Sequence, residues 1–139
     1  ASRVVLVGQS LGSGVAVEMA TRSKGARLVL ISPYTSIPDM VRRYLPFLPV
    51  GLMVRDRFDT FEKAPSIRVP TLVIHGEADR LIPADMGRAV AGAIPRAELQ
   101  IVAGASHNDI WRGTAVFDRL VAFASGAHAG GRGAHAPMN

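Results

Sequence analysis

The sequence predicts an α/β fold built on a parallel sheet of about four strands. Four short runs rich in valine, isoleucine and leucine are continuously apolar instead of alternating, which is typical of strands covered on both faces. Helical patterns lie between these runs, so strand and helix alternate along the 139 residues. Such alternation favours parallel strands joined by right-handed crossovers. The expected strands are residues 4–7, 28–31, 71–74 and 99–102.

Four helices are expected between and after these strands. Residues 14–22 are small and amphipathic, and residues 37–44 also have a helical pattern. Residues 83–94 begin with a proline, which the first turn of a helix accepts readily. Residues 114–124 carry apolar side chains on one helical face, namely Val116, Leu120, Val121 and Phe123.

Two segments depart from the alternation of strand and helix. Residues 33–69 are longer than one crossover needs and contain the apolar "YLPFLPVGLMV" followed by the polar "RDRFDTFEKAP". We expect this segment to form a cap-like excursion above the sheet. Residues 126–139 consist largely of glycine, alanine and histidine without periodicity, which predicts a disordered tail.

Composition argues against several classes of protein. Sixteen basic and eleven acidic residues give a net charge of +5, but the arginines are scattered, so no nucleic-acid partner is expected. The chain has no cysteine, which excludes disulfides, thiolate metal sites and a cysteine nucleophile. The longest apolar run, residues 44–54, is interrupted and falls short of the roughly 20 residues of a spanning helix. Because a strand pattern begins almost at Ala1, we expect a piece of a longer protein, and the cellular compartment is left open.

The segment "GQSLG", residues 8–12, joins the first expected strand to the first expected helix. A glycine-rich turn before a helix can bind phosphate, but a P-loop needs a lysine before its hydroxyl residue, and Ser13 directly follows Gly12. The glycine spacing of a dinucleotide fingerprint is not met either. The pattern matches a nucleophile elbow, in which a strained turn exposes Ser10. The alternative is an ordinary glycine-rich turn, and the position at a strand end favours the elbow.

An elbow of this kind makes further demands on the chain. Gly8 and Gly12 are expected because the turn brings strand and helix too close for a β-carbon. The amide of Leu11, at the start of the helix, is expected to donate to a developing oxyanion. A serine hydroxyl also needs a histidine to take its proton and a carboxylate to orient that histidine.

The chain supplies these groups in the order serine, acid, histidine, as this turn requires. The third strand is followed by "HGEADRLIP" and the fourth by "GASHNDI". The carboxyl ends of parallel strands meet at one edge of a sheet, where open α/β folds build their sites. We therefore predict a triad of Ser10, Asp79 and His107, for which no cofactor or metal is required.

Other residues near this edge are candidates for the same roles. Asp79 is preferred to Glu77 because it lies two residues further beyond the strand, from where its carboxylate can extend to the histidine. Asp109 follows His107 too closely to orient its ring easily. His75 ends a strand, and a structural role is favoured for it, hydrogen bonding the loop that carries the acid.

Longer motifs resemble the α/β-hydrolase superfamily, most closely the membrane-associated serine hydrolases typified by alpha/beta hydrolase domain-containing protein 13 and the Bem46 proteins. The motifs are "VGQSLGSGVAVEMA", "ISPYTSIPDM", "LPFLPVG", "DRFDT", "VPTLVIHGEADRLIPADMGRAV" and "AGASHND", between about Arg3 and about Trp111. The resemblance implies a serine hydrolase with Ser10 as nucleophile, Asp79 as acid, His107 as base and Leu11 in the oxyanion hole. Some relatives cleave thioesters or carboxylic esters, so a small-molecule or lipid-like ester is the expected substrate.

The resemblance also implies that residues 1–125 are the C-terminal half of an α/β-hydrolase domain, with the N-terminal half of the sheet absent. The loop that supplies a second oxyanion amide in the family then has no counterpart, so the fragment alone is expected to be nearly inactive. The first strand would expose an apolar edge. Attachment to a membrane through a preceding segment is left open.

Two alternatives to hydrolysis stand beside it. A noncatalytic fragment would bind a partner through its exposed sheet edge, and an acyltransferase would use the same three side chains. Within the excursion, the apolar residues Phe47, Leu48 and Leu52 would either hold an acyl chain or pack on the sheet.

Overall fold

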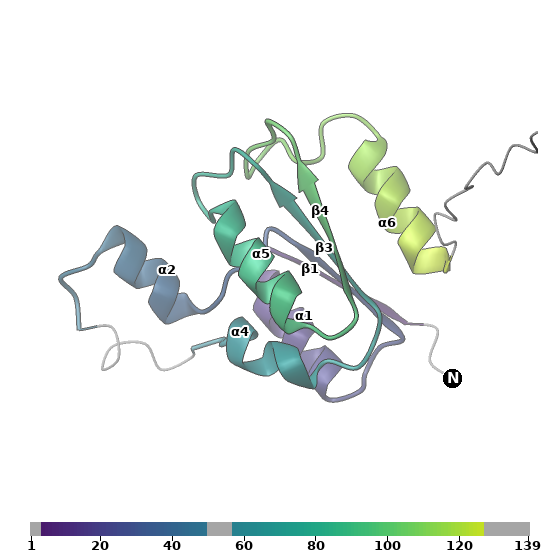
Figure 1. The fold of residues 1–139 in the computed structure, drawn as a ribbon, viewed down its shortest axis with the longest axis horizontal. Coiled ribbons are helices and arrows are strands. Elements are labelled where there is room, and N and C mark those ends of the chain that lie inside the picture. Colours follow the sequence, from purple (N-terminus) through teal and green to yellow (C-terminus); the bar gives the residue numbers. More distant parts are fainter. Residues whose placement is uncertain (1–3, 50–56, 127–139) are drawn as a thin grey trace, which may run out of the picture.

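Four parallel strands form one sheet in the computed structural model, which describes residues 4–49 and 57–126. The order β1-β2-β3-β4 follows the sequence, and all three pairings are parallel. Figure 1 shows the strands side by side at the centre of the molecule. The strands are β1 (Val5–Gln9), β2 (Arg27–Ile31), β3 (Thr71–Gly76) and β4 (Ala97–Val102). The predicted fold class is thus confirmed.

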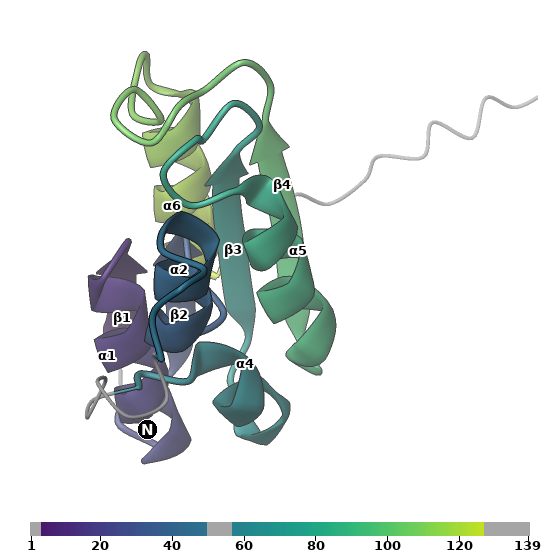
Figure 2. The same ribbon diagram turned by 90° about the vertical axis from the view of Figure 1, so that its left-hand side faces the viewer.

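Helices cover both faces of the sheet (Figure 2). α1 (Gly12–Thr21) and α5 (Ala84–Ala93) pack on one face, together with η1 (Ala64–Ser66), which follows the short helix α4 (Thr60–Lys63). α6 (Ala115–Ser125) packs on the other face. Successive residues of β2 and β3 alternate between the two layers, so both strands are buried on both sides. This double burial is the physical reason why their sequences are continuously apolar.

The elements end close to where the sequence predicts. The helix over residues 37–44 has the expected bounds, and the helices expected at 83–94 and 114–124 shift by one residue at their ends. The first helix begins two residues earlier than expected, at Gly12, because the turn at Ser10 leads directly into it. β1 and β3 run two residues beyond the expected strands, which carries their C-terminal ends toward the candidate site.

The excursion between β2 and β3 begins with α2 (Ile37–Tyr44), which stands away from the sheet in Figure 1. Its first turn is capped by Ser36, whose hydroxyl accepts from the Asp39 N–H at 3.1 Å. The base of α2 packs on Tyr34 and Met86, and beyond the helix Phe47 is 97% exposed and does not pack on the sheet. Leu52 lies outside the described residues. That residues 33–69 form a cap-like excursion stays a prediction, as does the division into domains.

β1 lies at the edge of the described sheet, with β2 as its partner. Val7 is 51% exposed there, whereas β3, in the middle, is buried along its whole length. In the described ranges no helix has the length and apolar character needed to cross a bilayer. Residues 127–139, which include nearly all of the predicted disordered tail, are outside the described residues.

Candidate active site

Ser10 occupies the sharp turn between β1 and α1. Its φ is 51°, in the left-handed region that side-chain-bearing residues rarely adopt. The Ser10 N–H donates to the carbonyl of Ile31 at 2.9 Å. The Ser10 carbonyl accepts from the N–H of Ser13 at 3.0 Å and from its hydroxyl at 2.6 Å. These bonds on both sides hold the strained backbone, as a nucleophile elbow requires.

The glycines around the turn have different reasons to be there. A β-carbon on Gly8 would lie 2.6 Å from the Gly12 carbonyl oxygen and 2.7 Å from the Ala16 Cβ, as the sequence predicts for this position. A β-carbon on Gly12 would meet nothing within 4 Å in the described part of the chain, so the steric reason predicted for Gly12 is wrong. Gly14 is the second glycine that close packing demands, because a β-carbon there would collide with the Tyr34 hydroxyl.

Tyr34 packs against the start of α1, next to the elbow. This role was not predicted from the sequence. It is 1% exposed, and its hydroxyl donates to the Leu11 carbonyl at 3.3 Å. Burial raises the pKa of Tyr34 to about 12, so it remains a donor at neutral pH. The signal that would have found it is a tyrosine just past an apolar strand, opposite a helix whose glycine leaves room for a ring.

Leu11 takes the N-cap position of α1, and its side chain is exposed. The amides at a helix N-terminus have no partner within the helix. The N–H of Leu11 immediately follows Ser10, which places a backbone donor next to the serine hydroxyl. An oxyanion role for this amide stays a prediction.

Asp79 lies in the loop after β3, with its side chain fully buried. Its Oδ1 accepts from the N–H groups of Leu81 at 2.9 Å and Ile82 at 2.8 Å. Its Oδ2 lies 2.7 Å from the Nδ1 of His107. The loop therefore uses one carboxylate oxygen to fix the turn and leaves the other for the histidine.

His107 lies between Asp79 and Ser10. Its Nε2 is 3.1 Å from the Ser10 Oγ. A carboxylate oxygen accepts, so Nδ1–H donates to Asp79, and Nε2 is left to accept from the Ser10 hydroxyl. The structure thus brings together the three side chains that the sequence singles out, from the ends of β1, β3 and β4.

The alternatives lie elsewhere. Glu77 is exposed, and its Oε2 accepts from the Gly104 N–H at 3.1 Å, away from His107. Asp109 closes its own loop by accepting from the Ser106 N–H, and that hydrogen bond lowers the pKa of Asp109. His75 is fully buried and donates from Nε2 to the Ile82 carbonyl at 2.7 Å, in the loop that carries the acid.

A cavity of about 410 Å³, here called the His107 hollow, opens beside the histidine. It is lined by Ala78, Arg80, Leu81, Ser106, His107 and Asn108. The Tyr44 hydroxyl at the end of α2 contacts the carbonyls of Arg80, at 2.8 Å, and Leu81. The excursion is therefore attached to the loop that carries Asp79.

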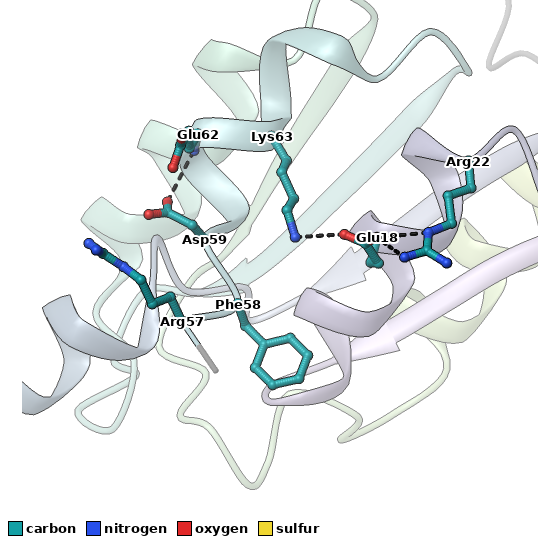
Figure 3. Close-up of a pocket in the computed structure, with 7 residues that line it drawn as sticks. All are labelled: Glu18, Arg22, Arg57, Phe58, Asp59, Glu62 and Lys63. Atoms are coloured by element: carbon teal, nitrogen blue, oxygen red, sulfur yellow. Dashed lines mark hydrogen bonds and ion pairs between the residues drawn. The ribbon is translucent and has the colours of Figure 1, made fainter. Parts of the chain in front are cut away.

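A second cavity, of about 450 Å³, lies between α1 and the chain around α4 (Figure 3). Glu18 is one of the residues that line it, with Lys63 Nζ at 2.6 Å and Arg22 Nε at 2.8 Å from its carboxylate (Figure 3). The hydrogen bond from Lys63, and then that from Arg22, lowers the pKa of Glu18. The Lys63–Glu18 pair connects α4 to α1 across 45 positions of sequence, whereas the Arg22–Glu18 pair is local to α1. None of the three predicted site residues lines this cavity.

Part of the chain matches a known family model, and most of it is similar to part of longer proteins. Residues 53–114 match the family described as alpha/beta hydrolase fold. An uncharacterized protein of Mycobacterium tuberculosis is 37% identical over 109 residues, 78% of this chain and 39% of that protein. Alpha/beta hydrolase domain-containing protein 17C of Mus musculus is 34% identical over 128 residues, 88% of this chain and 37% of that protein. The chain therefore spans under two fifths of the length of these relatives.

Solved structures share the architecture. An esterase from Thermogutta terrifontis superposes with a TM-score of 0.69 at 19% identity, over 91% of this chain and 66% of that chain. The esterase RhEst1 from Rhodococcus superposes with a TM-score of 0.68 at 17% identity, over 89% of this chain and 66% of that chain. Likeness at this identity is a likeness of fold. The chain carries part of the α/β-hydrolase fold.

Proposed function

We propose that the protein is a serine hydrolase that cleaves carboxylic ester or thioester bonds through an acyl-enzyme. The observation that carries the proposal is the continuous line of contacts from Ser10 Oγ through His107 to Asp79, at 3.1 and 2.7 Å. In this proposal Ser10 is the nucleophile, His107 the general base and Asp79 the acid that orients it. A hydroxyl activated in this way attacks acyl carbons.

Acylation begins when the Ser10 hydroxyl gives its proton to His107 Nε2 and its oxygen bonds to the acyl carbon. The carbonyl oxygen becomes an oxyanion, which the Leu11 N–H stabilises. As the bond to the leaving oxygen or sulfur breaks, His107 returns the proton to that atom. Asp79 stabilises the charged imidazole between these two steps.

Deacylation repeats the same proton transfers with water. Water gives a proton to His107 Nε2 while its oxygen attacks the acyl carbon of the ester on Ser10. The tetrahedral intermediate collapses, and His107 protonates the departing Ser10 oxygen. The products are a free acid and the original hydroxyl.

One part of such a site lies beyond the described residues. An oxyanion hole on this fold uses a second N–H from a loop that precedes the elbow strand. Because the matched part covers under two fifths of these relatives, we propose that residues outside this chain supply the second donor in the whole protein. Loss of one such donor costs about a hundredfold to a thousandfold in turnover, so residues 1–139 alone should be far less active than the whole protein.

The substrate that this proposal favours is a small-molecule or lipid-like ester. The His107 hollow opens directly beside the base and is lined partly by the apolar Ala78 and Leu81. The exposed apolar residues after α2, among them Phe47, are candidates for contact with an acyl chain. We also propose that the protein belongs with alpha/beta hydrolase domain-containing protein 13 and the Bem46 proteins. Under this proposal the whole protein associates with a membrane.

Labelling with a fluorophosphonate tests the proposal in the full-length protein that the gene encodes. Such a probe reacts with an activated serine hydroxyl, so the unmodified protein should be labelled and Ser10→Ala should abolish the label. Ser125→Ala is the matched control, because that exposed serine caps the end of α6 and should leave the signal unchanged. An unlabelled native protein would contradict hydrolysis and favour the noncatalytic alternative.

A panel of p-nitrophenyl esters of increasing chain length would then define the substrate class. Preference for acyl esters is the expected result. Faster product formation with added alcohols or amines, with the acyl group found on them, would favour an acyltransferase that uses the same three residues.

A further inference from the structure

His75 is enclosed on every side at the end of β3. It is 0% exposed, and its ring packs against α5 at Gly87, where a β-carbon would collide with the ring nitrogen Nδ1. The glycine on α5 thus makes the space for this imidazole. A buried imidazole needs a hydrogen bond, and the partner of this ring shows what it holds in place.

The hydrogen bond joins the ring to the turn that carries the acid. His75 Nε2 lies 2.7 Å from the Ile82 carbonyl oxygen, which can only accept, so Nε2 carries the proton. The N–H of the same residue, Ile82, donates to Asp79 Oδ1 at 2.8 Å. One residue of the turn is therefore held through its carbonyl by His75 and through its amide by Asp79.

His75 also lies close to the carboxylate itself. Its Nε2 is 3.6 Å from Asp79 Oδ2, the oxygen that lies 2.7 Å from His107. Three charged or titratable groups surround the ring: Asp79 in the acid loop, His107 after β4 and Asp85 on α5. Burial is the largest influence and lowers the pKa of His75, so the ring is neutral at neutral pH. A cationic ring here would compete with His107 for the same carboxylate oxygen.

We propose that His75, as the neutral Nε2–H tautomer, is a positioning residue that holds the Ile82 carbonyl so that Asp79 Oδ2 stays available to His107. This role rests on the proposed function, because it serves the orientation of the base. His75 Nδ1 has no hydrogen-bond partner within the described ranges, and it is buried. A buried nitrogen without a partner costs less as a bare acceptor than as a donor on a charged ring, which favours the neutral ring. The hydrogen bond to the Ile82 carbonyl then places the proton on Nε2.

Two substitutions test the hydrogen bond in the protein as its gene encodes it. His75→Leu removes the donor, and kcat should fall about a hundredfold with KM changed by less than about twofold. The acidic limb of the pH–rate profile should move to lower pH, because a loosened Asp79 stabilises the charged His107 less. His75→Gln places an amide N–H near the position of Nε2 and should restore most of kcat and the position of that limb.

A glycine pair on one helix supplies the matched control. Gly87→Ala should displace the ring and reproduce the effect of His75→Leu, whereas Gly92→Ala, with nothing within 4 Å in the described residues, should leave kcat unchanged. Equal losses in His75→Leu and His75→Gln, or an unmoved pH profile, would overturn the positioning role and leave a packing role.

Nitrogen NMR of the native protein provides a readout that needs neither activity nor a stable variant. The His75 ring should be neutral at neutral pH, with the proton on Nε2. A ring that is charged at neutral pH, or one with the proton on Nδ1, would overturn the proposal. If the ring behaves as expected and Ser10 is not labelled, the proposed function fails while the contact between His75 and the acid loop stands.

Discussion

Asp79 Oδ2 lies 2.7 Å from His107 Nδ1, although 28 positions separate the two residues. The contact forms because β3 and β4 are parallel neighbours, so the loops that follow them leave the same edge of the sheet. The carboxylate is buried, its second oxygen is occupied by two amides, and the contact therefore fixes the ring in one orientation.

Replacing this carboxylate should be severe. We expect Asp79→Asn to lower kcat about ten-thousandfold, because an amide favours the wrong tautomer of the base. Steady-state hydrolysis of a p-nitrophenyl ester measures the change. Glu77→Gln is the matched control, because Glu77 is exposed and contacts Gly104 instead of His107. A similar loss in both variants would contradict the assignment of Asp79.

The two helical glycines after Ser10 should respond in opposite ways. Gly14→Ala should destabilise the protein by about 1–3 kcal/mol, because the new methyl group collides with the buried Tyr34 hydroxyl. Gly12→Ala meets open space and should be neutral or stabilising by up to about 1 kcal/mol, since alanine favours the helix. Urea unfolding monitored by circular dichroism gives both values, and equal destabilisation would show that space is not the cause.

Stability should fall in mild acid because of His75. Its pKa is lowered in the folded state, chiefly by burial, so below the ordinary histidine value of about 6.5 the unfolded chain binds more protons than the folded one. The free energy of unfolding is therefore highest above that pH and decreases as pH falls through it. Urea midpoints at successive pH values measure this slope. His75→Gln should flatten the slope just below about pH 6.5, and an unchanged slope would assign it to other groups.

The ion pairs at Glu18 should contribute little. Lys63→Met removes a contact of 2.6 Å between α4 and α1, but both side chains are about a third exposed, at 38% and 31%. We expect a loss below about 1 kcal/mol, shrinking further in high salt. Urea unfolding at low and high ionic strength measures it. A loss of stability that does not depend on salt concentration would indicate that the aliphatic part of the lysine side chain contributes by packing.

Sequence patterns were sufficient for the four strands, for the helices α1, α2, α5 and α6, and for the order of the site residues. The short helices α4 and η1 were not predicted. The apolar runs of β2 and β3 are readable because both strands are buried on both faces. Ser10, Asp79 and His107 could be named because each follows a strand that ends at the same edge of the sheet. Their mutual distances could not be predicted, because β1 and β4 are not neighbours and the loop after β4 has to bring His107 to Ser10. Their catalytic roles remain our proposal.

Other features depend on contacts between segments distant in sequence. Whether a glycine is sterically required depends on what lies opposite, which is why Gly14 matters through Tyr34 and Gly12 does not. The partner of His75, the Ile82 carbonyl, is set by how the loop closes, and a sequence pattern specifies only that the histidine ends a strand. The same holds for the contact of Tyr44 with the acid loop.

The backbone at Ser10 is left-handed, with φ of 51°. This conformation exposes the hydroxyl at the turn but lowers the stability of the fold. A residue with a β-carbon pays about 1 kcal/mol for that conformation, whereas glycine adopts it freely. Ser10→Gly should therefore yield a more stable protein, and under the proposed function that protein is inactive. Selection for thermal stability alone would replace this serine by glycine. A thermostable relative that keeps the serine would therefore support a catalytic role for it.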